Sequence, residues 1–428
     1  MTDAQIPFLP AEALGKVART DDRIPAVIGT KPFSWRGDDN TGNMIHAAAA
    51  RRMMSKFVEY ERPGEWSDAD IERLRAEHSH IVFVTANLIR LGVPGDHPSI
   101  KALMAGLVPL AKNLERAGLP IVVFGLGTQA ALCGPYEFTA APEVVRLLKV
   151  ISDYSRKIAV RGPFTAEACI KLGIKNVEVI GCQSMFWHRS PGFSWPLSEP
   201  GSDQPPRIAF NFTDAPLEAK LINQAIASGH DVIGQQNDAE EDVKAHESER
   251  VFSEPAKYNW GVSLAFEKGL LDRSNYEQWI KRHFYQFRQP EPWLEHMRRY
   301  SFSYGTRLHG NIAAMLAGVR AIWIVHDMRL KEVCDHFRLP TIGFDEVRAG
   351  ADVQTLYDRA DYSQCHQIYP ARYRALFDYV DGAGLPHSLP EPIESTGAPA
   401  SRITANAHTH IEPASAEREF GALTSQFA

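Results

Sequence analysis

The sequence predicts an α/β protein built from two Rossmann-like, doubly wound parallel-sheet domains that face one another across a cleft. Short runs of apolar and β-branched residues alternate with helical patterns along most of the chain, which is typical of parallel sheets. With 428 residues the chain is too long for one ordinary core. A run rich in proline, serine and glycine, 196–206, separates the two groups of alternating segments and predicts a linker.

The expected strands follow one another along both halves of the chain. They are Ile24–Ile28, Ile81–Thr85, Ile121–Gly125, Lys157–Val160 and Val177–Ile180, then Arg207–Asn211, Asp231–Gly234, Tyr300–Tyr304 and Ala321–Val325. We therefore expect an N-terminal domain over 20–195, a C-terminal domain over 205–365 and a C-terminal helix over 366–385. Residues 386–428 are rich in Pro, Ser, Ala and Thr without periodicity, which predicts a poorly ordered tail.

Composition excludes several classes of function. A net charge of -6 argues against a general nucleic-acid binder. The five cysteines are widely spaced without a CxxC pair, as in a cytoplasmic protein with reduced thiols and no metal centre. Neither a signal peptide nor an apolar run long enough to span a bilayer is present. The chain also lacks the GxSxG, HExxH and P-loop patterns of common hydrolases and nucleotide-binding enzymes.

The most informative segment runs from Ser303 to Asn311, between an expected strand and an expected helix. The apolar spacing from Leu308 onward predicts that Leu308 points into the core, which leaves Arg307 and His309 for the cleft. Gly310 removes a side chain from the first helical turn and would permit close approach of a ligand. An arginine at a helix start favours a phosphate or carboxylate, and a histidine there favours proton transfer. The alternative is that Arg307 pairs with a carboxylate and His309 only caps the helix.

Arg161 repeats this arrangement in the first half of the chain. It directly follows the expected strand Lys157–Val160, and Pro163 suits the first position of a helix. Arg161 and Arg307 would then approach one cleft from two sheets and together clamp an anion with more than one charged group. The alternative for Arg161 alone is a surface ion pair.

A glycine pair follows the expected strand Ile121–Gly125. Gly125 and Gly127 suggest a tight loop whose backbone amides meet a ligand, with Gln129 as a polar contact. The full dinucleotide-binding pattern is absent because position 130 is alanine.

Two further polar segments are expected to face the cleft. Asn40, Gly42 and Asn43 favour a turn and the N-cap of the alanine-rich helix that follows, although capping alone would explain either asparagine. His326 and Asp327 come directly after the expected strand Ala321–Val325 and should also look into the cleft.

These units, in this order, resemble the polysaccharide pyruvyltransferase family. The resemblance spans roughly residues 24–385 and is strongest from Arg307 to Pro340. Its motifs are Asn40-x-Gly42-Asn43, Gly125-x-Gly127-x-Gln129, Val160-Arg161, Ile180-Gly181-Cys182-Gln183-Ser184 and Arg307-Leu308-His309. It implies a fold similar to GT-B glycosyltransferases and transfer of pyruvate from phosphoenolpyruvate to sugar hydroxyls, forming a ketal.

The resemblance also implies roles and partners. Arg161 and Arg307 would hold the phosphate and carboxylate of the donor, and His309 would be the acid; no cofactor is needed besides phosphoenolpyruvate as donor. The acceptor would be a sugar of an exopolysaccharide or lipid-linked glycan, which is compatible with a cytoplasmic protein at the inner membrane face and with a homo-oligomer. Two alternatives remain: a GT-B glycosyltransferase or nucleotide-sugar epimerase, and a non-catalytic glycan-binding protein.

Overall fold

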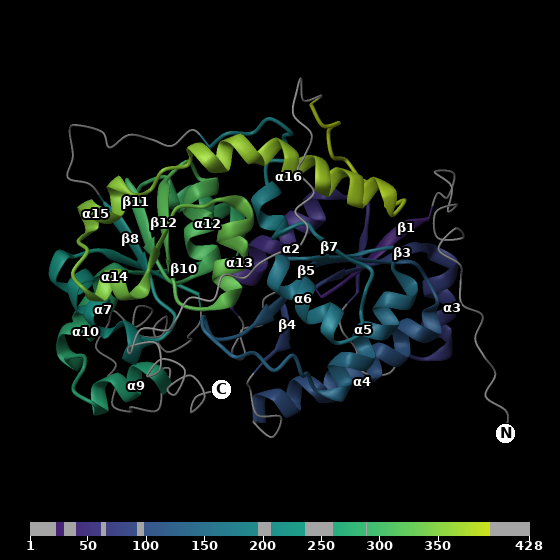
Figure 1. Ribbon diagram of the computed structural model, residues 1–428, viewed down its shortest axis with the longest axis horizontal. Helices are drawn as coiled ribbons and strands as arrows, with labels where there is room; N and C mark the ends of the chain where they lie inside the picture. The colour runs from purple at the N-terminus through teal and green to yellow at the C-terminus, as the bar shows by residue number, and fades with distance from the viewer. Residues whose placement is uncertain are drawn as a thin grey trace.

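The computed structural model describes residues 23–29, 40–60, 66–91, 98–195, 207–235, 260–287 and 289–393. Two parallel sheets with helices on both faces lie side by side along the long axis of the molecule (Figure 1). The predicted α/β class with two doubly wound sheets is confirmed. The predicted linker 196–206 and the tail from residue 394 lie outside the described residues, and the domain limits at 195 and 205 stay predictions.

The first sheet has seven strands, all parallel to their neighbours, in the order β2-β1-β3-β5-β6-β7 with β4 beside β5. The strands are β1 (Ile24–Ile28), β2 (Val58–Tyr60), β3 (His78–Val84), β4 (Asn87–Arg90), β5 (Ile121–Gln129), β6 (Ile158–Val160) and β7 (Val177–Val179). Apolar side chains on both faces account for this all-parallel arrangement, because parallel sheets are covered on both sides.

The second sheet has six parallel strands in the order β10-β9-β8-β11-β12-β13. They are β8 (Ile208–Asn211), β9 (Asp231–Gly234), β10 (Phe284–Gln286), β11 (Phe302–Gly305), β12 (Arg320–Val325) and β13 (Thr341–Gly343). From β8 the strand order runs to β9 and β10 on one side and from β11 to β12 and β13 on the other. Ligands of such sheets bind outside the carboxyl ends of the strands at the switch point between β8 and β11.

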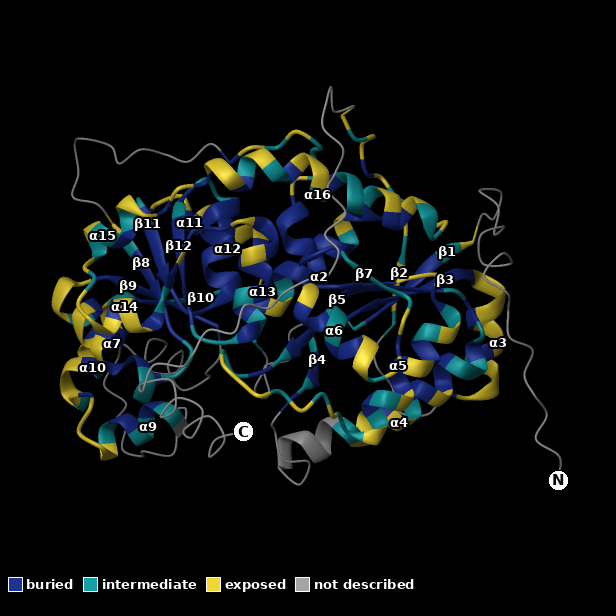
Figure 2. Ribbon diagram, in the orientation of Figure 1, coloured by how far each residue is buried: buried dark blue, intermediate teal, exposed yellow. Residues whose placement is uncertain are grey.

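Three hydrophobic clusters hold these layers together (Figure 2). One covers the outer face of the first sheet with α3 (Asp68–Glu77), α4 (Pro98–Ala117), α5 (Pro142–Tyr154) and α6 (Pro163–Lys171). A second covers the outer face of the second sheet with α7 (Ala215–Ser228), α9 (Trp260–Glu267), α10 (Arg273–His283), α14 (Phe344–Arg348) and α15 (Val353–Asp358). The third is shared by the two inner faces, so the halves meet through a common core.

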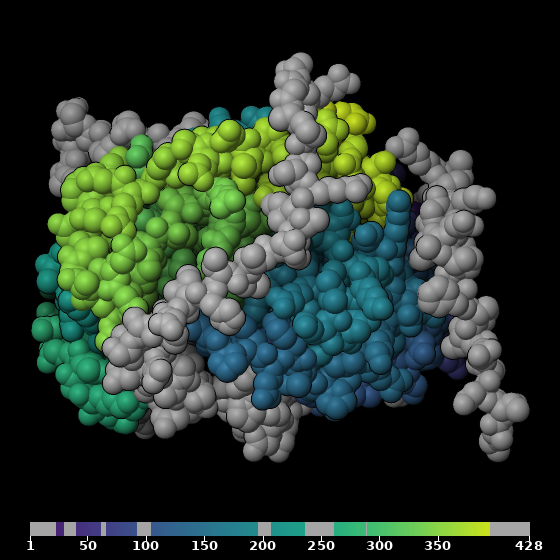
Figure 3. Space-filling model, in the orientation of Figure 1, coloured from purple at the N-terminus to yellow at the C-terminus, as the bar shows by residue number. Residues whose placement is uncertain are grey.

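The shared core is built around helices between the sheets. They are α2 (Gly42–Met53), the 3-10 turn η1 (Gln183–Phe186), α11 (Pro290–Met297), α12 (Leu308–Leu316), α13 (Met328–Phe337) and α16 (Ser363–Gly382). α16 crosses both halves: the Tyr362 hydroxyl at its start donates to Ala321 O at 2.8 Å, and the Tyr379 hydroxyl donates to Val123 O at 2.7 Å. Figure 3 shows this C-terminal helix lying over both the green and the blue parts of the surface.

The glycine pair in the first sheet does not form the predicted loop. β5 continues through Gly127 to Gln129 and pairs there with β4. Gly125 has a φ of 78°, and the pairing with β6 shifts between Val123 and Leu126, so the irregularity is a bulge within the strand. The loop prediction was wrong because a bulge and a turn use the same glycine signal.

Helix ends follow local sequence signals. Ser67 accepts the Asp70 N–H, and the Asp70 side chain accepts the Ser67 N–H, so a capping box begins α3. Gly318, just after α12, has a φ of 85°, the left-handed backbone that commonly ends a helix at a glycine. None of the described helices combines the length and apolar character needed to cross a membrane.

Candidate active site

The turn between β11 and α12 is held by Asn211, which ends the neighbouring strand β8. Asn211 O accepts the Thr306 N–H at 3.1 Å, and Asn211 Oδ1 accepts the Arg307 N–H at 2.8 Å. Gly305 has a φ of 146°, and a Cβ there would lie 1.8 Å from Asn211 O. Only glycine therefore allows the two strand ends to meet so closely at the switch point.

Asn311 secures the same turn from inside the sheet. Its Nδ2 donates to Gly305 O and Ile322 O, both at 3.1 Å. Its Oδ1 accepts from Ser303 Oγ at 2.9 Å and from Asn211 Nδ2 at 2.8 Å. All hydrogen-bonding capacity of this fully buried amide is used, so the position of Arg307 and His309 is specified by the core.

The space that Gly310 leaves is occupied by protein side chains. A Cβ at Gly310 would lie 2.7 Å from Gln235 Nε2 and 3.0 Å from Asn211 Cγ. Close packing within the second domain is thus sufficient reason for this glycine, and a contact of Gly310 with a ligand stays a prediction.

His309 faces residues from the first half of the chain. Its ring centroid lies 5.4 Å from that of His46 on α2, and its Nε2 lies 3.7 Å from Cys182 Sγ beside η1. A Cβ at Gly42 would lie 2.9 Å from His309 Cβ, so this glycine lets the start of α2 reach the start of α12. The structure therefore brings the predicted Asn40–Asn43 segment and His309 together.

His46 is held by neighbours on both ring nitrogens. Gln183 Nε2 donates to His46 Nδ1 at 3.0 Å, which assigns the ring proton to Nε2, and Nε2 then donates to Asn43 Oδ1 at 3.3 Å. Asn43 thus orients His46. Asn40 Oδ1 accepts the Gly42 N–H at 2.9 Å and so satisfies one free amide at the start of α2.

The pKa of His309 is lowered well below its ordinary value. Burial is the main cause, followed by His46 and by the charges of Arg161 and Arg329. The arginines that lower the pKa of His309 are therefore Arg161, which follows β6, and Arg329 on α13. Its neighbour in sequence, Arg307, instead affects the pKa values of Asp214 and His326. In this state His309 is neutral at pH 7, and a bound anion would raise its pKa.

Arg161 is a buried cation with unused donors. It is 2% exposed, its Nη1 donates to Asn87 Oδ1 at 3.2 Å, and its Nε and Nη2 have no partner among the described residues. A Cβ at Gly127 would lie 2.9 Å from Arg161 Cδ, so Gly127 makes room for this side chain. The surface ion pair considered from the sequence is wrong, and a buried guanidinium in this condition is costly unless a ligand completes it.

Two further arginines, Arg90 and Arg329, were not predicted from the sequence, and the charge of Arg329 acts on Arg161. The Nε atoms of Arg90, at the end of β4, and of Arg329 on α13 are both buried, and neither has a partner in the part of the chain that the structure describes. Burial and the charge of Arg329 lower the pKa of Arg90. Burial and Arg329 also lower the pKa of Arg161, against the opposing effects of Cys182 and Glu332. Nothing local marks Arg90, because β4 is too short to show a periodic pattern.

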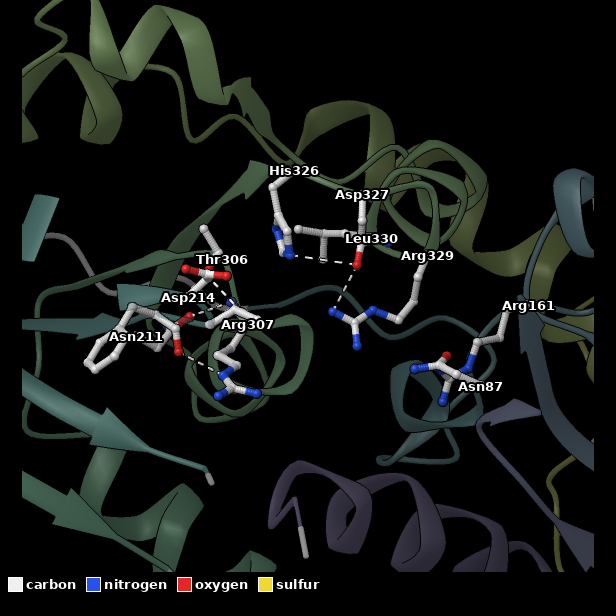
Figure 4. Close-up of polar contacts among 12 residues, drawn as sticks. Asn87, Arg161, Asn211, Asp214, Thr306, Arg307, His326, Asp327, Arg329 and Leu330 are labelled. Carbon is white, nitrogen blue, oxygen red and sulfur yellow. Dashed lines mark hydrogen bonds and ion pairs between the residues drawn. The ribbon is translucent and has the colours of Figure 1, made fainter. Parts of the chain in front are cut away.

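His326 and Asp327 lie between the two sequence-predicted arginines (Figure 4). Asp327 Oδ1 accepts the Leu330 N–H at 2.8 Å and caps α13, while its Oδ2 lies 3.0 Å from Arg329 Nη2. His326 Nε2 lies 3.6 Å from the same Oδ2. Burial opposes ionisation of Asp327, but Arg329 and His326 prevail and lower its pKa. The carboxylate is therefore charged and holds both neighbours.

Arg307 and Arg161 stand at opposite ends of this group in Figure 4. Arg307 is 6% exposed, and its Nε donates to Phe212 O at 2.7 Å. The clamp that the sequence suggested between Arg161 and Arg307 stays a prediction. Gln129 ends β5, where its backbone oxygen accepts the Leu91 N–H at 2.9 Å, so it does not sit in the ligand loop expected from the sequence.

Comparison with known proteins places the chain in a family. Residues 40–328 match the model of the polysaccharide pyruvyl transferase family. No curated protein matches the sequence significantly. Similar solved structures include an S. aureus MnaA–UDP co-structure, with 11% identity and a TM-score of 0.43, covering 85% of this chain and 97% of that chain.

Two other similar structures are an epimerase with a bound sugar nucleotide and a glycosyl transferase. UDP-GlcNAc 2-epimerase from Neisseria meningitidis, bound to UDP-GlcNAc, has 8% identity and a TM-score of 0.40, covering 84% of this chain and 99% of that chain. A family 9 glycosyl transferase from Veillonella parvula has 12% identity and a TM-score of 0.29, covering 85% of this chain and 97% of that chain. The family match includes Arg161 and the Arg307–His309 turn, and the chain belongs to the polysaccharide pyruvyl transferase family.

Proposed function

We propose that this chain transfers pyruvate from phosphoenolpyruvate to hydroxyls of a sugar in a polysaccharide or lipid-linked precursor, forming a ketal. The observation that carries the proposal is the buried Arg161 guanidinium, whose Nε and Nη2 lack partners within the described ranges and whose charge acts on the buried, neutral His309. Phosphoenolpyruvate is a small molecule with a phosphate and a carboxylate, and the reaction needs an acid beside that charge.

The chemistry assigns one task to each group. His309, once protonated, gives its proton to the methylene carbon while a sugar hydroxyl oxygen bonds to the adjacent carbon. The bond from that carbon to the phosphate oxygen then breaks, and a second hydroxyl oxygen takes its place to close the ketal. One hydroxyl proton restores His309 and the other leaves with phosphate, so atoms and charges balance.

Donor binding would prepare the acid. Without a ligand, burial and nearby cations keep His309 neutral. The negative charges of the donor would offset those cations and raise the pKa of His309, so that protonation follows binding. Arg161 would stabilise the departing phosphate through charge-assisted hydrogen bonds. The acceptor lipid, where there is one, would bring the protein to the inner face of the membrane.

Release of phosphate from phosphoenolpyruvate, measured with a panel of free and lipid-linked sugars, tests the proposal. We expect release with at least one acceptor, and His309→Ala should abolish it while leaving the melting temperature close to that of the wild type. Full activity of His309→Ala would contradict the role of His309. Stabilisation by nucleotide sugars without a response to phosphoenolpyruvate would favour a glycosyltransferase or epimerase, and binding of glycans without turnover a non-catalytic protein.

A further inference from the structure

The two halves of the molecule make a buried polar contact between α13 and the start of α6. Glu332 Oε2 accepts the Thr165 N–H at 2.9 Å, and Glu332 Oε1 accepts the Thr165 hydroxyl at 2.7 Å. Both residues are almost completely buried. A Cβ at Gly162 would lie 2.7 Å from Glu332 Cβ, so a larger residue would keep α13 from docking.

This contact is continuous with the surroundings of Arg161. Thr165 Oγ1 accepts the Thr128 N–H at 2.9 Å, which ties α6 to β5. Thr128 follows Gly127, the glycine that makes room for Arg161, and Gly162 follows Arg161 in the chain. Glu332 is therefore anchored on the same turn that positions Arg161.

Docking of Glu332 also places Arg329. The two residues are three positions apart on α13 and so lie on one face of that helix. The start of α13 is held against the end of β5, where the Met328 N–H donates to Ala130 O at 3.1 Å. The charge of Arg329 reaches both Arg161 and Arg90, since it lowers the pKa of each.

Around the contact between α13 and α6, the described residues leave part of the positive charge of the arginines uncompensated. Arg90, Arg161 and Arg329 each keep at least one buried nitrogen to which no described residue bonds. Of the two nearby carboxylates, Asp327 pairs with Arg329, and Glu332 is committed to Thr165. Burying guanidiniums that act on one another, as Arg329 acts on Arg90 and on Arg161, is unfavourable unless an anion joins them.

We propose that Arg90, Arg161 and Arg329 form a site for a small ligand with two anionic groups, and that Glu332 is the positioning residue that assembles this site across the two domains. The inference rests on the proposed function: the ligand is the donor, and its second anionic group lies on Arg90 and Arg329 instead of on Arg307.

Calorimetric titration of the full chain with inorganic phosphate, sulfate and phosphoenolpyruvate tests the site. Arg90→Gln and Arg329→Gln should each weaken phosphoenolpyruvate binding about tenfold or more. Lys331→Gln is the matched control, because Lys331 lies on the same helix but pairs with Asp335 at the surface. Wild-type affinity in Arg90→Gln and Arg329→Gln, or no binding of any of the three anions to the wild type, would overturn the site.

Variants of the contact test the positioning role. Glu332→Ala and Thr165→Val should each weaken anion binding about as much as Arg329→Gln, whereas Glu332→Gln should retain most of it because its amide can still bond to Thr165. Arg329→Gln added to Glu332→Ala should cause little further loss of anion affinity, since Arg329 is no longer held in place once Glu332 is removed. Full additivity of the two changes, or wild-type binding in Thr165→Val, would overturn the positioning role.

The outcomes separate this inference from the function on which it rests. Anion binding that depends on Arg90 and Arg329, without turnover of phosphoenolpyruvate, would contradict the proposed function and support the site. Turnover with an unchanged KM for phosphoenolpyruvate in Arg90→Gln and Arg329→Gln would support the function and overturn the site.

Discussion

Arg307 and His309 are two residues apart in the chain but face different groups of side chains. Arg307 is the N-cap of α12 in extended backbone, and its Nε donates to Phe212 O at 2.7 Å within the second domain. His309 lies inside the first helical turn, with its ring 5.4 Å from that of His46 in the first domain. The short motif thus contacts both halves of the molecule: Arg307 bonds within the second domain, and the His309 imidazole faces the first domain, which carries Arg161.

Replacing Arg161 by Met should stabilise the fold and abolish anion binding. The guanidinium is buried, and two of its nitrogens are unpaired with respect to the described residues, so an apolar side chain of similar length should raise the free energy of unfolding by about 1–3 kcal/mol. Urea denaturation and phosphate titration check both parts. Arg146→Met, at an exposed position on α5, is the control. It should change neither the free energy of unfolding nor that of phosphate binding by more than about 0.5 kcal/mol. A destabilised Arg161→Met protein that still binds phosphate would contradict the prediction.

Gly127→Ala should weaken anion binding by displacing Arg161. The added methyl would lie 2.9 Å from Arg161 Cδ, and the neighbouring Asn87 Oδ1 at 3.3 Å leaves little room to adjust. We expect a loss of about tenfold in phosphate affinity. Gly106→Ala on α4 is the control, because a Cβ at Gly106 would meet no atom within 4 Å. Alanine should stabilise this helix relative to glycine by up to about 1 kcal/mol. Equal affinities in the two variants would argue against the role of Gly127.

Asn311→Ala should destabilise the protein strongly. The change leaves four buried partners of the amide without hydrogen bonds, so the free energy of unfolding should fall by about 3 kcal/mol or more. Asn223→Ala removes one exposed hydrogen bond to Leu270 O and should cost about 1 kcal/mol or less. Denaturation curves of the two variants, measured side by side, decide whether the turn depends on Asn311.

The stability contributed by Glu332 should fall as pH rises. Burial raises the pKa of Glu332 from 4.5 to about 7 in the folded protein. The folded state therefore holds this proton more tightly, and the contribution is lost between about pH 4.5 and 7, then stays level. The difference in unfolding free energy between wild type and Glu332→Gln should change by up to about 3 kcal/mol over that window. A difference that does not vary with pH would show that Glu332 titrates normally.

Sulfate binding near pH 6.5 should take up protons through His309. Its lowered pKa is expected to rise when an anion offsets Arg161 and Arg329, and sulfate itself does not titrate there. Calorimetry in buffers of different ionisation enthalpy measures the uptake. His309→Gln should reduce it, whereas His336→Gln should not, because burial holds the pKa of His336 at about 3. Equal uptake in wild type and His309→Gln would assign the proton to another group.

Much of the fold could be predicted because long parallel strands carry their own signal. The apolar runs that become β3, β5 and β12 are buried on both faces, so they stand out in the sequence. Short strands such as β4 and β13 were missed, since three or four residues are too few to show a pattern. Gly125 was misread because the sequence alone does not distinguish a bulge from a turn.

By itself, the sequence determined the two-sheet α/β class, the strand-to-helix turns that carry Arg161 and Arg307, and the helical position of His309, because backbone geometry and burial patterns act locally. Tertiary structure alone decided which side chains meet. His46 and Arg329 reach His309 from other elements, and Glu332 reaches Thr165 across the domain junction. The pairs His46–His309 and Thr165–Glu332 join residues more than 100 positions apart, and the energies of such contacts come from burial, close packing and charge that exist only once the two halves have docked.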